Sequence, residues 1–254
     1  MKIIGIIPAR YNSTRFPGKP LALINNKTIL ERVYLQAKKS KYLHDVIIAT
    51  DDERIKSIAE SISATCLITS THHLTGTDRC NEAINLFNQI NQTYYDIIIN
   101  IQGDHPFINP ADIDLLAMSF ENNNNIQIST LIKEIESAEE LFNPNTVKVI
   151  TFRDAEAIYF SRHPIPFLRD VNINQWIKKH KFYKHIGIYA FKTEILQKIV
   201  LLKPSKLELA ESLEQLRWLE NGFKIQTIIT KNETYSVDTP EDLKKIMQKP
   251  YFIP

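Results

Sequence analysis

Several features are scarce in this chain of 254 residues, and each scarcity argues against a class of protein. The two cysteines, Cys66 and Cys80, argue against a disulfide framework and a cysteine-ligated metal site, so we expect a reducing, cytoplasmic location. The formal net charge of +2 argues against a nucleic-acid or membrane role driven by bulk charge. No apolar run approaches the length of a membrane span, and the N-terminal residues lack the layout of a signal peptide.

Common signatures of cofactor and metal sites are also missing. There is no G-x-G-x-x-G motif and no Walker A motif, since Gly18-Lys19 is followed by Pro20 rather than by Ser or Thr. The seven histidines include no pair spaced for a helical zinc site. Ser161 stands near His163 without the spacing of a catalytic triad, so we interpret it as structural. These absences argue against a dinucleotide site, a P-loop and a zinc site.

Strand and helix patterns alternate through the first half of the chain. Apolar runs at 3–7, 45–50, 65–69 and 95–102 predict strands, and helical periodicity fills the intervals between them. The second half is less regular: it predicts strands at 127–131, 147–151, 157–162, 185–191 and 223–230, and one helix over 208–220. We expect a single α/β domain over residues 1–254, with a mixed, mostly parallel sheet flanked by helices.

A basic loop, residues 8–21, follows the first predicted strand. It contains three cations (Arg10, Arg15 and Lys19), the hydroxyl of Ser13, and Gly18 directly before the lysine. Guanidinium groups bind phosphate oxygens bidentately, lysine adds a point charge, and glycine allows backbone N–H groups to come close. A loop at the carboxyl end of an inner strand opens onto the ligand crevice of an α/β sheet. We therefore predict a phosphate-binding loop; the alternative is a solvated basic turn.

Two aspartates far apart in the sequence could complete this site. Asp104 follows the apolar strand 95–102, and Asp238 closes the short strand-like element Val237-Asp238, just before a helix begun by Thr239. Mg²⁺ usually takes one or two protein carboxylates together with phosphate oxygens, so the two aspartates could share this ion if both strands end at one edge. The alternatives are a turn aspartate and a plain acid at a helix start.

The loop and the aspartates belong to a series of motifs that resembles the bacterial 3-deoxy-manno-octulosonate cytidylyltransferases, the CMP-Kdo synthetases. The resemblance covers nearly the whole chain. Besides Pro17-Gly18-Lys19-Pro20-Leu21, its motifs are Ala49-Thr50-Asp51, Thr75-Gly76-Thr77-Asp78-Arg79, Gln102-Gly103-Asp104, Phe142-Asn143-Pro144-Asn145, Tyr159-Phe160-Ser161-Arg162, His185-Ile186-Gly187-Ile188-Tyr189, Leu213-Glu214-Gln215-Leu216-Arg217 and Val237-Asp238-Thr239-Pro240-Glu241-Asp242.

The resemblance implies a nucleotide-diphospho-sugar transferase-like, Rossmann-like fold and the reaction of CTP with Kdo to give CMP-Kdo and pyrophosphate, for lipopolysaccharide biosynthesis. It implies that Asp104 and Asp238 bind Mg²⁺ and that the family's homodimer forms through a lobe at about 147–191. The implied catalytic residues are Arg10, Lys19, Asp104 and Asp238. The implied nucleotide ligands are Ala9, Arg10, Ser13, Arg15, Lys19 and Arg79. The implied sugar ligands are Gln102, Arg162, His185, Tyr189, Glu214 and Gln215.

One residue departs from the family pattern. His105 stands after Gln-Gly-Asp, where the family commonly has Glu and a relative acting on 8-amino-Kdo has Gln. The change replaces an anion with a group that titrates near neutrality, beside the implied metal and sugar site. This change leaves 8-amino-Kdo or another acidic sugar, such as a sialic acid, as alternative substrates. The alternative interpretation of His105 is that it only caps the turn and faces solvent. A non-catalytic nucleotide-binding regulator is the alternative of another class.

Overall fold

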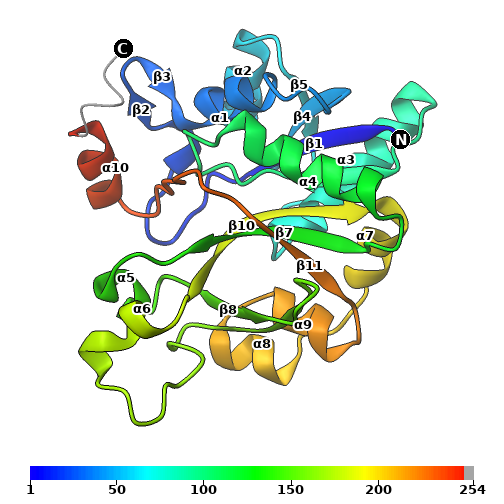
Figure 1. Ribbon diagram of the computed structural model, residues 1–254. Coiled ribbons are helices and arrows are strands. Elements are labelled where there is room, and N and C mark those ends of the chain that lie inside the picture. The colour runs from blue at the N-terminus through cyan, green and yellow to red at the C-terminus, as the bar shows by residue number, and fades with distance from the viewer. Residues whose placement is uncertain (249–254) are drawn as a thin grey trace. The chain divides into compact units, whose positions relative to one another are not determined.

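The computed structural model describes residues 1–248, and the chain divides into two compact units. Unit 1 comprises Met1–Met118 and the segment that begins at Glu233, and unit 2 comprises Ser119–Asn232. Figure 1 labels their helices and strands. One nucleotidyltransferase domain over the whole chain, with a dimerisation lobe at 147–191, stays a prediction; the lobe falls within unit 2.

Unit 1 contains four parallel strands in the order β6-β1-β4-β5. They are β1 (Ile3–Ala9), β4 (Asp45–Thr50), β5 (Thr65–Ile68) and β6 (Ile97–Asn100). β1 lies between β4 and β6, and most of its residues are buried, as its unbroken apolar run predicted. The basic loop therefore starts at the carboxyl end of an inner strand, where a parallel sheet binds its ligands.

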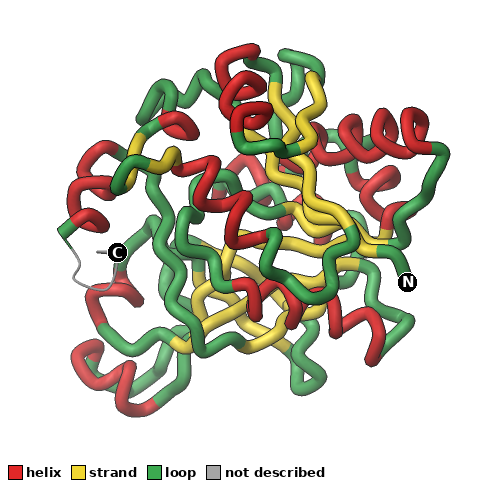
Figure 2. Tube along the Cα trace, turned by 90° about the horizontal axis from the view of Figure 1, so that it is seen from above, coloured by secondary structure: helices red, strands yellow, loops and turns green. Residues whose placement is uncertain are grey.

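Helices and a small hairpin complete unit 1. They are η1 (Lys19–Leu21), β2 (Leu23–Ile24), β3 (Lys27–Thr28), α1 (Ile29–Ala37), α2 (Glu53–Ser61), α3 (Gly76–Asn91) and α10 (Pro240–Met247). α4 (Pro110–Asn122) includes the boundary between the units. Thr28, Thr75 and Thr239 cap α1, α3 and α10, because each threonine hydroxyl accepts a backbone N–H of the first turn. Figure 2 shows that long loops (green) join the helices (red) and strands (yellow).

A small buried cluster fixes the C-terminal segment of unit 1. Val237 and Ile246 pack with Ile24 and Ile29, and all four side chains are buried. Apolar burial of this kind contributes about 1.5–3 kcal/mol per side chain. Because Val237 is held in this cluster, the position of the next residue, Asp238, is determined as well.

Unit 2 contains five strands with mixed pairing: β7 pairs in parallel with β11, while the pairs β7–β10, β10–β8 and β8–β9 are antiparallel. The strands are β7 (Ile128–Glu134), β8 (Lys148–Thr151), β9 (Ala157–Ser161), β10 (Tyr183–Lys192) and β11 (Ile225–Ile229). The helices are α5 (Ala138–Phe142), η2 (Ile173–Gln175), α6 (Trp176–Lys179), α7 (Thr193–Ile199), α8 (Lys206–Glu211) and α9 (Gln215–Glu220). The expectation of a mixed sheet flanked by helices is confirmed.

Three local predictions were wrong. The helix expected over 208–220 is interrupted between α8 and α9, because Ser212 takes a left-handed conformation with φ 52°. Val237-Asp238 is not a strand, although its backbone bonds to Asp104. The strand expected over 95–102 ends at Asn100, so Asp104 lies in the turn that follows. Among residues 1–248, no helix has the length and apolar character needed to cross a membrane.

Candidate active site

A cavity of about 300 Å³ opens in unit 1 at the carboxyl ends of its strands. Its walls come from the end of β1, the basic loop, the start of α3, the turn after β6 and Asp238. Every site residue predicted within unit 1 contributes to this wall: Ala9, Arg10, Ser13, Arg15, Lys19, Arg79, Gln102, Asp104 and Asp238. The sequence motifs thus identify residues that the fold brings together, while their individual roles stay predictions.

The backbone of the basic loop is closed by a few hydrogen bonds. The Tyr11 carbonyl accepts from the N–H of Ser13 at 3.0 Å and from that of Gly18 at 2.9 Å. Gly18 has φ 71°, a left-handed conformation that favours glycine, and Lys19 then begins η1 with Pro20 in its first turn. This geometry directs Lys19 into the cavity wall.

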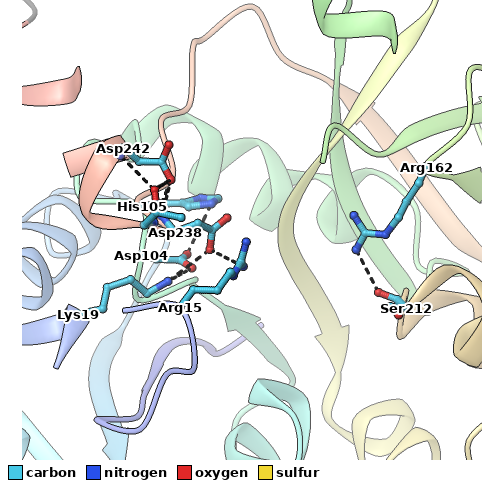
Figure 3. A network of polar contacts seen from close by, with 9 residues as sticks. Arg15, Lys19, Asp104, His105, Arg162, Ser212, Asp238 and Asp242 are labelled. Atoms are coloured by element: carbon cyan, nitrogen blue, oxygen red, sulfur yellow. Dashed lines mark hydrogen bonds and ion pairs between the residues drawn. The ribbon is translucent and has the colours of Figure 1, made fainter. Parts of the chain in front are cut away.

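Lys19 joins the two aspartates. Its Nζ lies 2.8 Å from Asp104 Oδ2 and 3.5 Å from Asp238 Oδ1, and Arg15 Nη2 lies 3.0 Å from the same Asp238 oxygen (Figure 3). The backbone N–H of Val237 also donates to the Asp104 carbonyl at 2.9 Å. Asp104 and Asp238 thus lie on one cation, as a shared ion would require, but a backbone hydrogen bond and a buried cluster bring them together rather than the two strand ends expected from the sequence.

Asp104 remains ionised in this setting. Burial raises the pKa of its carboxyl, but the charges of His105 and Lys19 and the hydrogen bond from Lys19 outweigh burial and lower the pKa overall. The two carboxylates already share one cation, the Lys19 ammonium, and their number matches the one or two that Mg²⁺ takes alongside phosphates. No larger group of three His, Cys, Asp or Glu side chains within residues 1–248 is arranged for a metal.

His105 is buried beside Asp104 and does not face solvent, so the solvent-exposed alternative is wrong. Its Nε2 lies 3.7 Å from Asp104 Oδ1, and its Nδ1 is buried without a hydrogen-bond partner. Burial lowers the pKa of the imidazole against the opposing charges of Asp104 and Asp238. An unpartnered buried nitrogen next to the cavity is the kind of atom that a bound ligand satisfies.

Arg79 is 3% exposed and held on α3 by two partners at the ends of β4 and β5. It donates to Thr69 Oγ1 at 2.6 Å and to Asp51 Oδ2 at 3.0 Å. Sequence reasoning missed a neighbour on this wall: the His73 ring bonds to Glu82, whose carboxylate also accepts the Ser70 N–H. The capping motif of Thr75 and Asp78 could have indicated that the preceding loop, with His73, lies at the start of a helix.

Unit 2 carries the other predicted sugar ligands. Tyr189 on β10 and Gln215 at the start of α9 are buried, and neither Tyr189 Oη nor Gln215 Nε2 has a hydrogen-bond partner. Burial, together with the charge of Glu214, raises the pKa of Tyr189. His185 Nε2 lies 2.9 Å from Thr130 Oγ1. Two unpartnered polar atoms on neighbouring elements are expected where a polar ligand binds.

Arg162 has a different environment. Its guanidinium donates to the backbone carbonyls of Glu211 at 2.7 Å and Pro144 at 3.1 Å. It also donates to the carbonyl of Ser212 at 3.3 Å (Figure 3). Glu211 in turn accepts from the Arg162 N–H and from Ser161 Oγ. These contacts connect Arg162 to the segment that leads into Glu214 and Gln215, and a role as a direct sugar ligand stays a prediction.

Comparison with known proteins agrees with this geometry. A family model described as cytidylyltransferase matches residues 4–228. A 3-deoxy-manno-octulosonate cytidylyltransferase from Parabacteroides distasonis is 50% identical over 251 residues, which cover 97% of each protein. The chain belongs to the cytidylyltransferase family. The 3-deoxy-manno-octulosonate cytidylyltransferase of Cytophaga hutchinsonii is 49% identical over 97% of this chain, and the predicted resemblance is confirmed.

Solved structures of cytidylyltransferases show the same fold. The structure of CMP:2-keto-3-deoxy-manno-octonic acid synthetase complexed with CTP matches with a TM-score of 0.87 and 38% identity, over 97% of both chains. A cytidylyltransferase from Leptospira borgpetersenii matches with a TM-score of 0.65 at 20% identity, which shows the fold alone. Asp238 lies beyond residues 4–228 of the family match, so its place at the cavity is evidence from the structure.

Gly103 allows two cavity walls of this cytidylyltransferase to approach each other. A Cβ added there would lie 2.9 Å from the Pro8 carbonyl oxygen, a backbone atom that cannot move aside cheaply. We expect Gly103→Ala to weaken CTP binding by about tenfold and to destabilise the protein by about 1–3 kcal/mol, because the walls must separate. Calorimetric titration with CTP and thermal unfolding measure both effects.

Gly222→Ala is the matched control. Gly222 has φ 80° with open space around it in unit 2, so alanine there adds backbone strain alone. It should lower stability and leave CTP affinity unchanged. An equal loss of CTP affinity in both variants would contradict the idea that CTP binding depends on the close contact between Gly103 and Pro8.

Proposed function

We propose that this cytidylyltransferase transfers CMP from CTP to 3-deoxy-manno-octulosonate (Kdo), giving CMP-Kdo and pyrophosphate for lipopolysaccharide biosynthesis. The carrying observation is that Asp104 and Asp238 bind one cation, the Lys19 ammonium, in a cavity lined by Arg10 and Arg15. The relatives of about half identical sequence over nearly the whole chain support the sugar.

In this proposal the basic loop binds the triphosphate of CTP. Arg10, Arg15 and Lys19 neutralise phosphate charge, which would otherwise repel an anionic nucleophile. Lys19 already has its ammonium fixed by Asp104, so little side-chain entropy remains to be lost when a phosphate oxygen arrives. Ser13 and the backbone of Ala9 contribute from the same loop, and Arg79 helps to hold the cytidine.

Asp104 and Asp238 would hold Mg²⁺. When bound, this ion neutralises charge on the α-phosphate and lowers the pKa of a bound hydroxyl. The lowered pKa of Asp104 keeps that carboxylate ionised near neutral pH, as a metal ligand must be. Arg15 and the Val237 backbone hold the two aspartates in place, which pre-organises the pair.

The family resemblance assigns the sugar to Gln102, Arg162, His185, Tyr189, Glu214 and Gln215. Kdo carries a carboxylate and several hydroxyls, which can satisfy the unpartnered Tyr189 Oη and Gln215 Nε2. The reaction is an attack of the anomeric hydroxyl in line on the α-phosphorus, in which the bond to the pyrophosphate leaving group breaks. Arg10 and Lys19 stabilise the charge that develops on the phosphate oxygens.

Homodimer formation and a cytoplasmic location belong to the same proposal. Four exposed apolar side chains fall within residues 147–191, namely Phe152, Ile158, Phe167 and Ile173, and they are available for a protein interface. Both cysteines are free, in keeping with a reducing compartment. Light scattering during size-exclusion chromatography would reveal the mass of a dimer.

Incubation of the protein with CTP and a panel of acidic sugars tests the activity. We expect CMP-Kdo by mass spectrometry and stoichiometric pyrophosphate, and EDTA should reduce turnover by more than about a hundredfold until Mg²⁺ is restored. Because His105 replaces the usual acid, the panel includes 8-amino-Kdo and a sialic acid, and faster turnover of either would replace Kdo in the proposal. CTP binding without turnover of any sugar would instead indicate a nucleotide-binding regulator.

A further inference from the structure

Tyr11 is the anchor of the basic loop. Its carbonyl accepts from both Ser13 and Gly18, so one residue ties the early and late parts of the loop together. Its side chain packs against Gly18, where an added Cβ would lie 3.2 Å from the ring atoms Cε2 and Cζ and from the hydroxyl Oη. Lys19 follows directly in η1. The position of the Tyr11 ring is therefore coupled to the position of the Lys19 backbone.

Arg54, in the first turn of α2, covers the Tyr11 ring. The guanidinium carbon lies 3.3 Å from the ring centroid, which is a close cation–π contact. Asp52 holds the guanidinium at two points, with Nε to Oδ1 at 2.9 Å and Nη2 to Oδ2 at 2.7 Å. Asp52 is also the N-cap of α2 and accepts the Arg54 N–H. The arginine fork is thus fixed to the helix before it meets the loop.

Neither Tyr11 nor Arg54 lines the cavity, whereas Arg10, Ser13 and Lys19 of the loop do. We propose that Arg54 and Tyr11 form a positioning pair that holds the basic loop in its CTP-binding conformation. The pair acts through the loop and touches no reacting atom. This inference rests on the proposed function, because it names CTP as the ligand of the loop.

The pair raises the fraction of molecules in which the basic loop has the conformation that binds CTP. Without the stack, Tyr11 is free to leave Gly18, and the loop samples conformations in which its cationic side chains no longer converge. Apparent affinity falls by the fraction of molecules in the competent state, while the bound complex keeps its chemistry. The expected signature is therefore a higher KM for CTP at unchanged kcat.

Arg54→Met tests the pair. We expect the Kd for CTP, measured by calorimetry without sugar, to rise about 2- to 5-fold, as an exposed cation–π contact allows. KM for CTP should rise equally, with kcat and the KM for the sugar unchanged. Tyr11→Leu should raise the Kd for CTP as much as Arg54→Met does, and Tyr11→Phe should leave it close to that of the wild type. The double variant Arg54→Met/Tyr11→Leu should bind CTP no more weakly than either single variant.

Two controls separate the alternatives. Lys56→Met removes a neighbouring cation of α2 that pairs with Glu53, so it measures the loss of long-range charge alone. Amide hydrogen exchange of residues 11–18 without ligand measures how often the loop opens, and Arg54→Met should accelerate this exchange. Unchanged exchange, additive effects in the double variant, or a Kd no higher than that of Lys56→Met would overturn the pair. A wild-type protein that fails to bind CTP would overturn the proposed function, and the exchange experiment would still test the pair.

Discussion

We expect Asp104→Ala to lower the rate of pyrophosphate release by at least about a thousandfold, while the protein stays folded. Its carboxylate is the anion closest to Lys19 and one of two that would hold Mg²⁺. Removing it takes away a metal ligand and leaves the Lys19 ammonium with only the longer contact to Asp238. The measurement is steady-state release of pyrophosphate at saturating CTP and Kdo, beside a circular dichroism spectrum.

Asp238→Ala should give a loss of the same order, because the proposal assigns both carboxylates to one ion. Asp104→Asn separates charge from shape, since it keeps the side-chain volume and should be nearly as inactive as Asp104→Ala. Glu136→Ala is the matched control: its side chain is 78% exposed, and the change should leave turnover as in the wild type. Near-normal turnover in either aspartate variant would reject the shared metal site.

The most useful rule for predicting the site was that a parallel sheet binds its ligands at the carboxyl ends of its strands. The apolar run before Arg10 and the cations after it were enough to place a phosphate-binding loop beside an inner strand, and β1 has this position. The proximity of Asp104 and Asp238 was also predictable, but its cause was not. A backbone hydrogen bond from Val237 and a cluster around Ile246 depend on tertiary packing that no local pattern encodes.

Other features were out of reach for the same reason. Ser212 interrupts a helix whose apolar period runs on, and its carbonyl accepts from Arg162, fifty residues away in the sequence. The stack of Arg54 on Tyr11 joins the first turn of α2 to the basic loop, and no shared motif links the two segments. The burial of His105 could not be read from its neighbours either, because a histidine after a turn aspartate is equally compatible with solvent. Such contacts join residues that are far apart in the sequence. The sequence therefore predicted which residues form the site better than it predicted the residues that each of them contacts.

Lys148→Met should destabilise the protein by about 3 kcal/mol and lower Tm by about 6–12 °C. The lysine is fully buried, and its Nζ donates to the carbonyls of Asn143, Thr146 and Arg162. Methionine fills a similar volume but cannot donate to these three carbonyls. Lys181→Met is the control: this side chain is 71% exposed and pairs with Glu134, so its loss should change Tm little.

The pH dependence of this difference tests the ionisation of Lys148. Burial lowers the pKa of its ammonium from 10.5 to about 8 in the folded protein. Between these two values the unfolded chain holds more protons than the folded one, so the contribution of Lys148 to stability rises with pH. The gap in unfolding free energy between wild type and Lys148→Met should therefore widen from pH 8 to pH 10, measured by urea denaturation. A gap that narrows would mean that the folded protein binds the Lys148 proton more tightly than the unfolded chain, and that the three carbonyls outweigh burial.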